Sequence, residues 1–142
     1  MNVMKKREPL SSIMTKDPVT VNINATLNEV RDLMGKHGFR HFPVVSGDEL
    51  VGIISQTDVM RLSFGNVFDN QKEIDQTMFD MLTIEDVMMT NPTSVPPGCT
   101  VGEVANLLIR VDFHALPVVE GKKLVGIVST TDVIRYFLRQ MD

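Results

Sequence analysis

The sequence contains no tryptophan, and it has a single tyrosine and a single cysteine among its 142 residues. One cysteine cannot form a disulfide within the chain, so we expect a reducing compartment, the cytoplasm. No apolar run approaches the roughly 20 residues that a membrane-spanning helix needs, and the first residues lack the apolar core of a signal peptide. We therefore expect a protein without a membrane segment.

The chain also lacks a surplus of positive charge. Its 18 aspartates and glutamates outnumber its 14 lysines and arginines, which gives a formal net charge of −4. Proteins that bind nucleic acid polymers usually carry excess basic residues that neutralise phosphates, so this function is not expected. The basic cluster Lys5–Arg7 is most simply interpreted as a solvated chain end.

Motifs for catalysis are missing as well. The three histidines, His37, His41 and His114, do not have the spacing of metal ligands. The sequence holds neither the Walker nor the dinucleotide type of glycine-rich phosphate loop. No base lies near Cys99 in the sequence, so a packed core residue is the simplest interpretation of this cysteine. We expect a protein that is not an enzyme and requires no cofactor or metal.

What the chain does contain is an internal repeat in an otherwise ordinary globular composition, 43% hydrophobic and 23% charged. When Pro18 is laid on Pro92, the segment from Ile13 to Arg61 overlays the segment from Val87 to Arg135 without a gap. Roughly two in five of the overlaid positions are identical, which chance does not produce. The sequence therefore predicts two copies of one structural unit.

Each copy carries the signals of a helix start. Thr26 and Glu29, and again Thr100 and Glu103, have capping-box spacing, in which each side chain satisfies a free backbone amide. The apolar positions that follow recur at helical spacing, which predicts one buried face per helix. These positions are Leu27, Val30, Leu33 and Met34 in the first copy, and Val101, Val104, Leu107 and Leu108 in the second.

Two apolar runs, Phe42–Val45 and Leu50–Ile54, flank the turn-forming residues Ser46–Asp48 and predict a β-hairpin. The segment Asp58–Leu62 is predicted to form a second helix. Each copy is thus expected to run strand, helix, strand, strand, helix, and we place the copies at residues 10–62 and 85–141.

Residues 63–84 connect the two copies and have no counterpart in the overlay. Ile74, Met78, Met81 and Leu82 lie about four residues apart and predict a short amphipathic helix. This helix could pack on its own module, or it could contact a second chain or an effector partner.

Both copies end in a nearly identical signature, from Gly52 to Asp58 and from Gly126 to Asp132. Glycine within a strand often marks the close approach of a ligand or of another backbone. The serine, threonine and aspartate that follow gather at a predicted helix start, where an anion is favoured and a carboxylate can accept from ribose hydroxyls. The same serine and aspartate could equally be helix caps. Spacing alone leaves the two interpretations open.

These residues resemble the cystathionine-β-synthase-type (CBS) domains, which occur in tandem pairs called Bateman modules. The resemblance extends from about Leu10 to the carboxyl end and rests on Met14–Pro18, on Arg40–Val45 and on the two Gly-x-x-Ser-x-Thr-Asp signatures. It implies an α+β fold in which two βαββα repeats pack sheet to sheet about a pseudo-twofold axis. Two clefts between the repeats then bind adenosine-containing ligands such as AMP, ADP, ATP, S-adenosylmethionine or NAD, and in some members cyclic dinucleotides.

The resemblance also implies roles for individual residues. Asp58 and Asp132 would hold ribose hydroxyls, with a serine and a threonine of each signature near the phosphate. The other implied ligand-binding residues of the first repeat are Met14, Val19, Thr20, Phe39, Ile53, Ser55 and Thr57. Those of the second repeat are Met88, Thr93, Ser94, Phe113, Ile127, Ser129 and Thr131.

The cations implied for phosphate binding differ between the repeats. Arg40 and His41 precede the proline of the first repeat, whereas His114 and Ala115 precede that of the second. An arginine suits phosphate because its guanidinium can make a bidentate contact, although each of these side chains could also simply face solvent. The two clefts should therefore differ in charge.

We expect a regulatory module that senses an adenine nucleotide and modulates a separate, unidentified effector protein. The alternative is a ligand-independent module for dimerisation or interaction. Family members usually form dimers, and the apolar helix faces after Leu27 and Val101 could supply a contact, so we also expect a homodimer.

Overall fold

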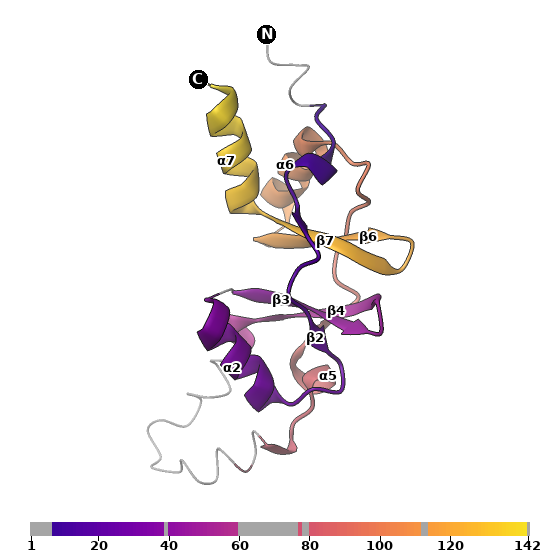
Figure 1. Cartoon of the computed structure of the whole chain (residues 1–142), viewed down its shortest axis with the longest axis vertical. Coiled ribbons are helices and arrows are strands. Elements are labelled where there is room, and N and C mark those ends of the chain that lie inside the picture. Colours follow the sequence, from indigo (N-terminus) through magenta and orange to yellow (C-terminus); the bar gives the residue numbers. More distant parts are fainter. Residues whose placement is uncertain (1–6, 39, 60–76, 78–79, 112–113, 142) are drawn as a thin grey trace. The chain divides into compact units, whose positions relative to one another are not determined.

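The computed structural model describes residues 7–38, 40–59, 77, 80–111 and 114–141. The fold is of the α+β class. The chain forms two compact units, and Figure 1 shows the elements of each. Unit 1 comprises Met1–Pro18 and Thr93–Asp142, and unit 2 comprises Val19–Pro92. Each unit thus combines most of one repeat with the opening segment of the other.

Unit 2 is built on the antiparallel hairpin of β3 and β4, around which lie two short strands and the helices α2 and α5. Strand β2 pairs in parallel with β3, and β5 pairs antiparallel with β4. Helices α2 and α5 lie on the same face of this hairpin (Figure 1). The bounds are β2 (Val21–Asn22), α2 (Leu27–His37), β3 (His41–Ser46), β4 (Glu49–Ser55), α5 (Ile84–Val87) and β5 (Met89–Thr90).

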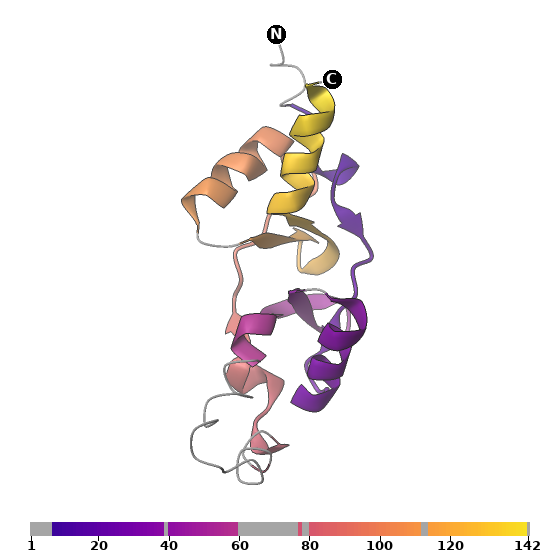
Figure 2. The ribbon, with the colours of Figure 1, turned by 90° about the vertical axis from the view of Figure 1, so that its left-hand side faces the viewer.

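Unit 1 repeats this plan with the hairpin of β6 and β7. Strand β1 pairs antiparallel with β7, and Val95 forms a parallel bridge with Val118 of β6. Helices α6 and α7 lie on one face of the hairpin (Figure 2). The bounds are η1 (Leu10–Ser12), β1 (Thr15–Lys16), α6 (Val101–Arg110), β6 (Ala115–Glu120), β7 (Lys123–Ser129) and α7 (Thr130–Gln140).

Both predicted capping boxes are confirmed. The amide of Glu29 donates to Thr26 Oγ1 at 3.1 Å, and the amide of Thr26 donates to Glu29 Oε2 at 3.1 Å. Thr100 and Glu103 make the same pair of bonds at the start of α6, at 3.1 and 3.2 Å. Two otherwise unpaired amides are satisfied at each helix start, which fixes where α2 and α6 begin.

Each unit has its own apolar core, and the predicted helix faces point into it. In α2 the buried residues are Leu27, Val30 and Met34, and in α6 they are Val101 and Val104. The remaining predicted positions, Leu33, Leu107 and Leu108, are partly buried against the same cores. The helical apolar pattern is thereby confirmed in both copies.

The predicted hairpins are present in both units and turn through Gly47 and Gly121. These glycines adopt φ angles of 64° and 65°, a left-handed conformation that other residues rarely adopt. The second helix of the first repeat begins at Gln56, two residues earlier than predicted, and is described to Val59. The counterpart helix α7 also begins directly after its serine.

The connector is described only in part. Thr77, Asp80 and Met81 are helical, in agreement with the predicted short helix, whereas Leu82 lies just beyond it. Ile74 and Met78, on which that prediction also rested, lie outside the described residues.

Candidate functional site

The signature that closes the second repeat forms a complete capping box at the start of α7. The amide of Asp132 donates to Ser129 Oγ at 3.1 Å, and the amide of Ser129 donates to Asp132 Oδ2 at 2.9 Å. The other carboxylate oxygen, Oδ1, lies 3.6 Å from Nη1 of Arg135 on the next turn. The capping interpretation of Ser129 and Asp132 is therefore correct.

The first repeat shows the N-cap bond of this arrangement at the helix that begins at Gln56. The amide of Asp58 donates to Ser55 Oγ at 3.1 Å. Asp58 and Asp132 are both half-buried, whereas Thr57 and Thr131 are exposed. Each carboxylate oxygen has two lone pairs, so a capping aspartate retains acceptor capacity for a second donor.

Arg40 and His114, the residues implied in phosphate binding, are hydrogen-bonded through their backbone carbonyls to the same helix starts. The amide of Gln56 donates to the carbonyl of Arg40 at 2.7 Å, and the amide of Thr130 donates to that of His114 at 2.9 Å. Arg40 and His114 are both exposed. An arginine therefore adjoins the helix start of unit 2, and a histidine adjoins that of unit 1.

These bonds leave one amide of each helix start without an acceptor. Among the described residues, the amides of Thr57 and Thr131 have no hydrogen-bond partner, whereas the amides on either side of each are bonded. An unpaired amide at the positive end of a helix dipole is a suitable donor to an anionic oxygen. Capping and anion binding are thus compatible at these positions.

The residues beside the cations differ in burial. His41 is half-buried and pairs with Ser55 across the hairpin, while Ala115 is 8% exposed and pairs with Ser129. The second repeat therefore has an apolar side chain where the first has an imidazole.

The strand glycines of the two signatures mark the approach of another backbone. A methyl group added to Gly126 would lie 2.9 Å from the carbonyl oxygen of Thr15, and one added to Gly52 would lie 2.9 Å from that of Met89. Both distances are shorter than real methyl contacts, so β1 and β5 can lie this close only against glycine.

Met14 and Met88, the two methionines implied in ligand binding, each pack against the hairpin of the other repeat. Met14 lies against Gly126 of unit 1, and Met88 lies against Gly52 of unit 2. Met88 is 9% exposed and belongs to the core of unit 2, whereas Met14 is half-buried. Each unit therefore brings together candidate residues from both repeats, a grouping that sequence order alone does not indicate.

The remaining candidates occupy varied environments. Val19, Thr20, Ser94, Ile53 and Ile127 are half-buried, while Thr93 is exposed. Ile53 of β4 pairs with Met89 of β5, and Ile127 of β7 pairs with Thr15 of β1. Phe39 and Phe113 lie outside the described residues.

The side chain of Cys99 shows no sign of an activated nucleophile. It packs at the edge of the unit 1 core, and burial together with the carboxylate of Glu103 raises its pKa. A raised pKa suppresses the thiolate, which is the reactive form.

The described residues contain neither a cluster suited to a metal ion nor a helix suited to a membrane. In the part of the chain that the structure describes, no group of three or more histidine, cysteine, aspartate or glutamate side chains could hold a metal ion. No helix among those residues is long and apolar enough to span a membrane.

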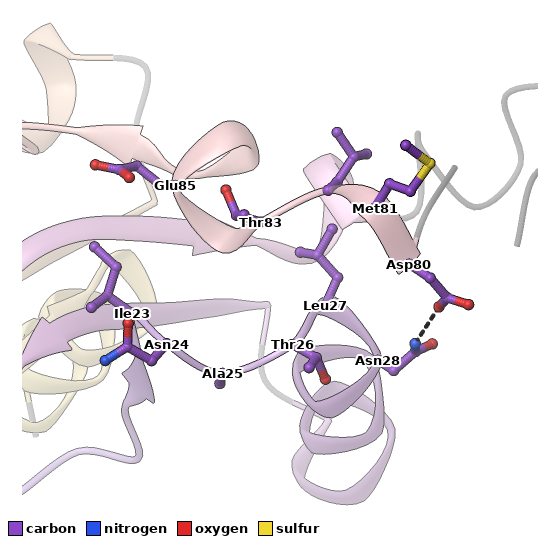
Figure 3. A pocket seen from close by; sticks show the side chains of 11 residues that line it. Ile23, Asn24, Ala25, Thr26, Leu27, Asn28, Asp80, Met81, Thr83 and Glu85 are labelled. Carbon is purple, nitrogen blue, oxygen red and sulfur yellow. Dashed lines mark hydrogen bonds between the residues drawn. The ribbon is translucent and has the colours of Figure 1, made fainter. Parts of the chain in front are cut away.

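Unit 2 also contains an open cleft of about 760 Å³ that the sequence did not predict. It lies between the segment that leads into α2 and the segment that leads into α5 (Figure 3). A hydrogen bond of 2.7 Å from Asn28 Nδ2 to Asp80 Oδ1 spans one end of it. The connector helix predicted around Met81 was the one signal that pointed to this region.

Comparison with known proteins covers both repeats. The uncharacterized protein MJ1225 of Methanocaldococcus jannaschii is 28% identical over 139 residues, 96% of this chain and 50% of that protein. The chain spans still less, 25% and 43%, of two further curated relatives.

Solved structures of similar size match along nearly the whole chain. CBSX2 from Arabidopsis thaliana in complex with AMP has a TM-score of 0.80 at 26% identity, covering 95% of this chain and 99% of that one. The CBS domain pair of MJ0100 in complex with 5′-methylthioadenosine and S-adenosyl-L-methionine has a TM-score of 0.76 at 27% identity, covering 93% and 97%.

The sequence profile of the CBS domain matches residues 10–65 and 84–139 of the chain. The chain therefore belongs to the CBS-domain family, and it is a tandem pair of CBS domains.

Proposed function

We propose that this CBS pair is a regulatory module that binds an adenosine-containing nucleotide and modulates a separate partner protein. One observation carries the proposal: similar CBS pairs along nearly the whole chain hold AMP, or 5′-methylthioadenosine and S-adenosyl-L-methionine. Asp58 and Asp132 are the proposed ribose-binding residues. The amides and hydroxyls of Thr57 and Thr131 are proposed to contact the phosphate.

The capping geometry supports a dual role for the aspartates. Asp132 is held by Ser129 and Arg135, so its carboxylate is already oriented before a ligand arrives. A preorganised acceptor loses little conformational entropy on binding, which favours affinity. Two ribose hydroxyls can donate to the lone pairs that the cap leaves unused.

The proposed sites are unequal. Arg40 can form charge-assisted, bidentate bonds to phosphate oxygens, whereas the imidazole of His114 at the equivalent position cannot make a bidentate contact. We propose that the site with Arg40 prefers the more highly phosphorylated ligand. The site with His114 would then accept ligands with less negative charge.

The proposal includes no catalytic step. CBS domains account for residues 10–65 and 84–139, and the half-buried Cys99 has a raised pKa. Signalling requires that the ligand bind two conformations or assembly states with unequal affinity.

We also propose that the chain forms a homodimer through unit 1. Exposed apolar side chains lie four residues apart on α7, at Ile134 and Leu138, and at Met141 just beyond its end, and Ile109 of α6 is 81% exposed. Contiguous exposed apolar side chains are typical of protein contact surfaces. The same observation favours the second candidate function, a ligand-independent interaction module.

Calorimetric titration separates the two functions. Protein freed of any co-purified ligand would be titrated with AMP, ADP, ATP, S-adenosylmethionine and 5′-methylthioadenosine. Saturable binding of at least one of them is expected. If none binds, the sensing function is wrong and the interaction module remains.

A further inference from the structure

The cleft of unit 2 occupies a place that is closed in unit 1. In unit 1, the chain before η1 runs alongside the chain that leads into α6. The amide of Leu10 donates to the carbonyl of Cys99 at 2.7 Å, and the amide of Val101 donates to that of Glu8 at 2.8 Å. These two bonds join the segments as a short antiparallel ladder.

The two CBS domain matches begin at Leu10 and Ile84, which is the same offset as in the repeat overlay, and this offset gives the equivalent groups of unit 2. They are the amides of Ile84 and Leu27 and the carbonyls of Ala25 and Leu82. Among the described residues, no hydrogen bond joins these four groups to one another. The open cleft separates the two segments instead, as the two rows of side chains in Figure 3 show.

All charged side chains among the described lining residues of the cleft are negative. It combines apolar side chains with two carboxylates, those of Asp80 and Glu85, and it includes no lysine, arginine or histidine among its described residues. Met81, at its rim, is 76% exposed. The lining residues are Ile23, Asn24, Ala25, Thr26, Leu27, Asn28, Asp80, Met81, Leu82, Thr83 and Glu85.

We propose that this cleft is a docking groove for an extended segment of a partner protein that carries an apolar residue flanked by lysine or arginine. An inserted strand would make the backbone hydrogen bonds that unit 1 makes internally, in the manner of β-strand addition. The apolar lining would hold the apolar side chain. Asp80 and Glu85 would attract cationic flanks and repel acidic ones.

This groove gives the module a route to its effector that is independent of the nucleotide. None of the lining residues belongs to the proposed ligand site. Failure of nucleotide binding would therefore leave this inference intact, and failure of peptide binding would leave the sensing function intact.

Nuclear magnetic resonance on the full, isotopically labelled chain tests the groove with a defined probe, the peptide acetyl-Lys-Val-Lys-Leu-Lys-amide. In the free protein, the amides of Leu27 and Ile84 should exchange with solvent faster than their bonded counterparts, Val101 and Leu10. Added peptide should slow their exchange and shift resonances of residues 23–28 and 80–85. The peptide acetyl-Glu-Val-Glu-Leu-Glu-amide should bind at least about ten-fold more weakly.

Substitution of one rim carboxylate adds a matched comparison. Glu85→Gln should weaken binding of the lysine peptide about three-fold, because an exposed ion pair contributes modestly. Glu49→Gln makes the same charge change on β4, away from the cleft, and should leave the affinity unchanged.

Three results would overturn the inference. The amides of Leu27 and Ile84 could be as protected in the free protein as those of Val101 and Leu10, which would mean that the cleft is closed in solution. The lysine peptide could fail to shift residues 23–28 and 80–85 at millimolar concentration. Finally, those resonances could shift with protein concentration alone, which would identify a second copy of the chain as the occupant.

Discussion

Ser129 and Asp132 cap the same helix reciprocally: the amide of each donates to the side chain of the other, at 2.9 and 3.1 Å. The pair fixes the start of α7 and holds the Asp132 carboxylate in one orientation. The same two residues are therefore structural in the free protein, and the proposed ligand contact would use acceptor capacity that the cap leaves on Asp132.

The cap itself should contribute measurably to stability. Ser129→Ala removes the acceptor for the Asp132 amide and should lower the free energy of unfolding by about 1 kcal/mol, a typical value for a lost N-cap. Thr100→Ala removes the equivalent cap of α6 and should cost a similar amount. Urea denaturation measures both, and an unchanged midpoint for Ser129→Ala would contradict a structural role for this serine.

The contact between Gly126 and β1 should not tolerate even a methyl group. Gly126→Ala places a carbon 2.9 Å from the carbonyl oxygen of Thr15, so the strand or Met14 must move. We expect a loss of about 1–3 kcal/mol, as for overpacked cores.

Gly98→Ala serves as the control for this substitution. Its added methyl group would meet no atom within 4 Å, so thermal and urea denaturation should show a much smaller change. Equal effects of the two substitutions would contradict the close approach of β1.

Cys99 should react slowly at neutral pH. Burial raises the pKa of the Cys99 thiol, and the neighbouring Glu103 carboxylate adds to the effect. Since only the thiolate reacts, very little of the thiol is reactive at pH 7, and the alkylation rate should rise about ten-fold per pH unit below the pKa. Labelling with iodoacetamide between pH 7 and 10 measures this. A rate that levels off below pH 9 would indicate an activated cysteine.

The apolar face of α7 should mediate self-association. Ile134→Ser with Leu138→Ser removes two side chains that are 54% and 59% exposed, so the monomer fold should be preserved. Light scattering at micromolar concentration should return the dimer mass for the wild type and the monomer mass for the variant. A wild-type monomer mass of 15.9 kDa would refute the dimer.

Local features of the fold were predictable because their causes are local. The capping pairs Thr26 and Glu29, and Thr100 and Glu103, need only the correct spacing, and the hairpin turns need only a glycine at Gly47 and Gly121. The repeat then required both copies to share these features.

The exchange of opening segments was not predictable from patterns of this kind. Leu10 is fully buried in the core of unit 1, and Ile84 is fully buried in that of unit 2, each among residues of the other repeat. The packing partner of an apolar residue depends on contacts between distant parts of the chain. The two CBS domain matches begin at Leu10 and Ile84, so these residues are equivalent, but the match does not show which core each one enters.

The candidate site was predictable only in part, because its residue signatures are local but its hydrogen bonds depend on the fold. The signatures located Ser129 and Asp132 at a helix start, but the hydrogen bonds that show both to be caps depend on the helix beginning at Thr130. The cleft beside Asn28 and Asp80 depends on a backbone ladder that one unit forms and the other does not, and this difference leaves no mark on the residue pattern.

Isothermal titration of aspartate variants measures whether Asp58 and Asp132 bind the ribose of an adenosine-containing ligand, as we propose. Asp58→Asn and Asp132→Asn retain a cap acceptor but remove the charge, and Glu29→Gln and Glu103→Gln make the same change at the caps of α2 and α6. We predict that the aspartate variants weaken nucleotide binding about ten-fold or more, while the glutamate variants bind as the wild type does. Wild-type affinity in both aspartate variants would mean that neither Asp58 nor Asp132 binds the ribose.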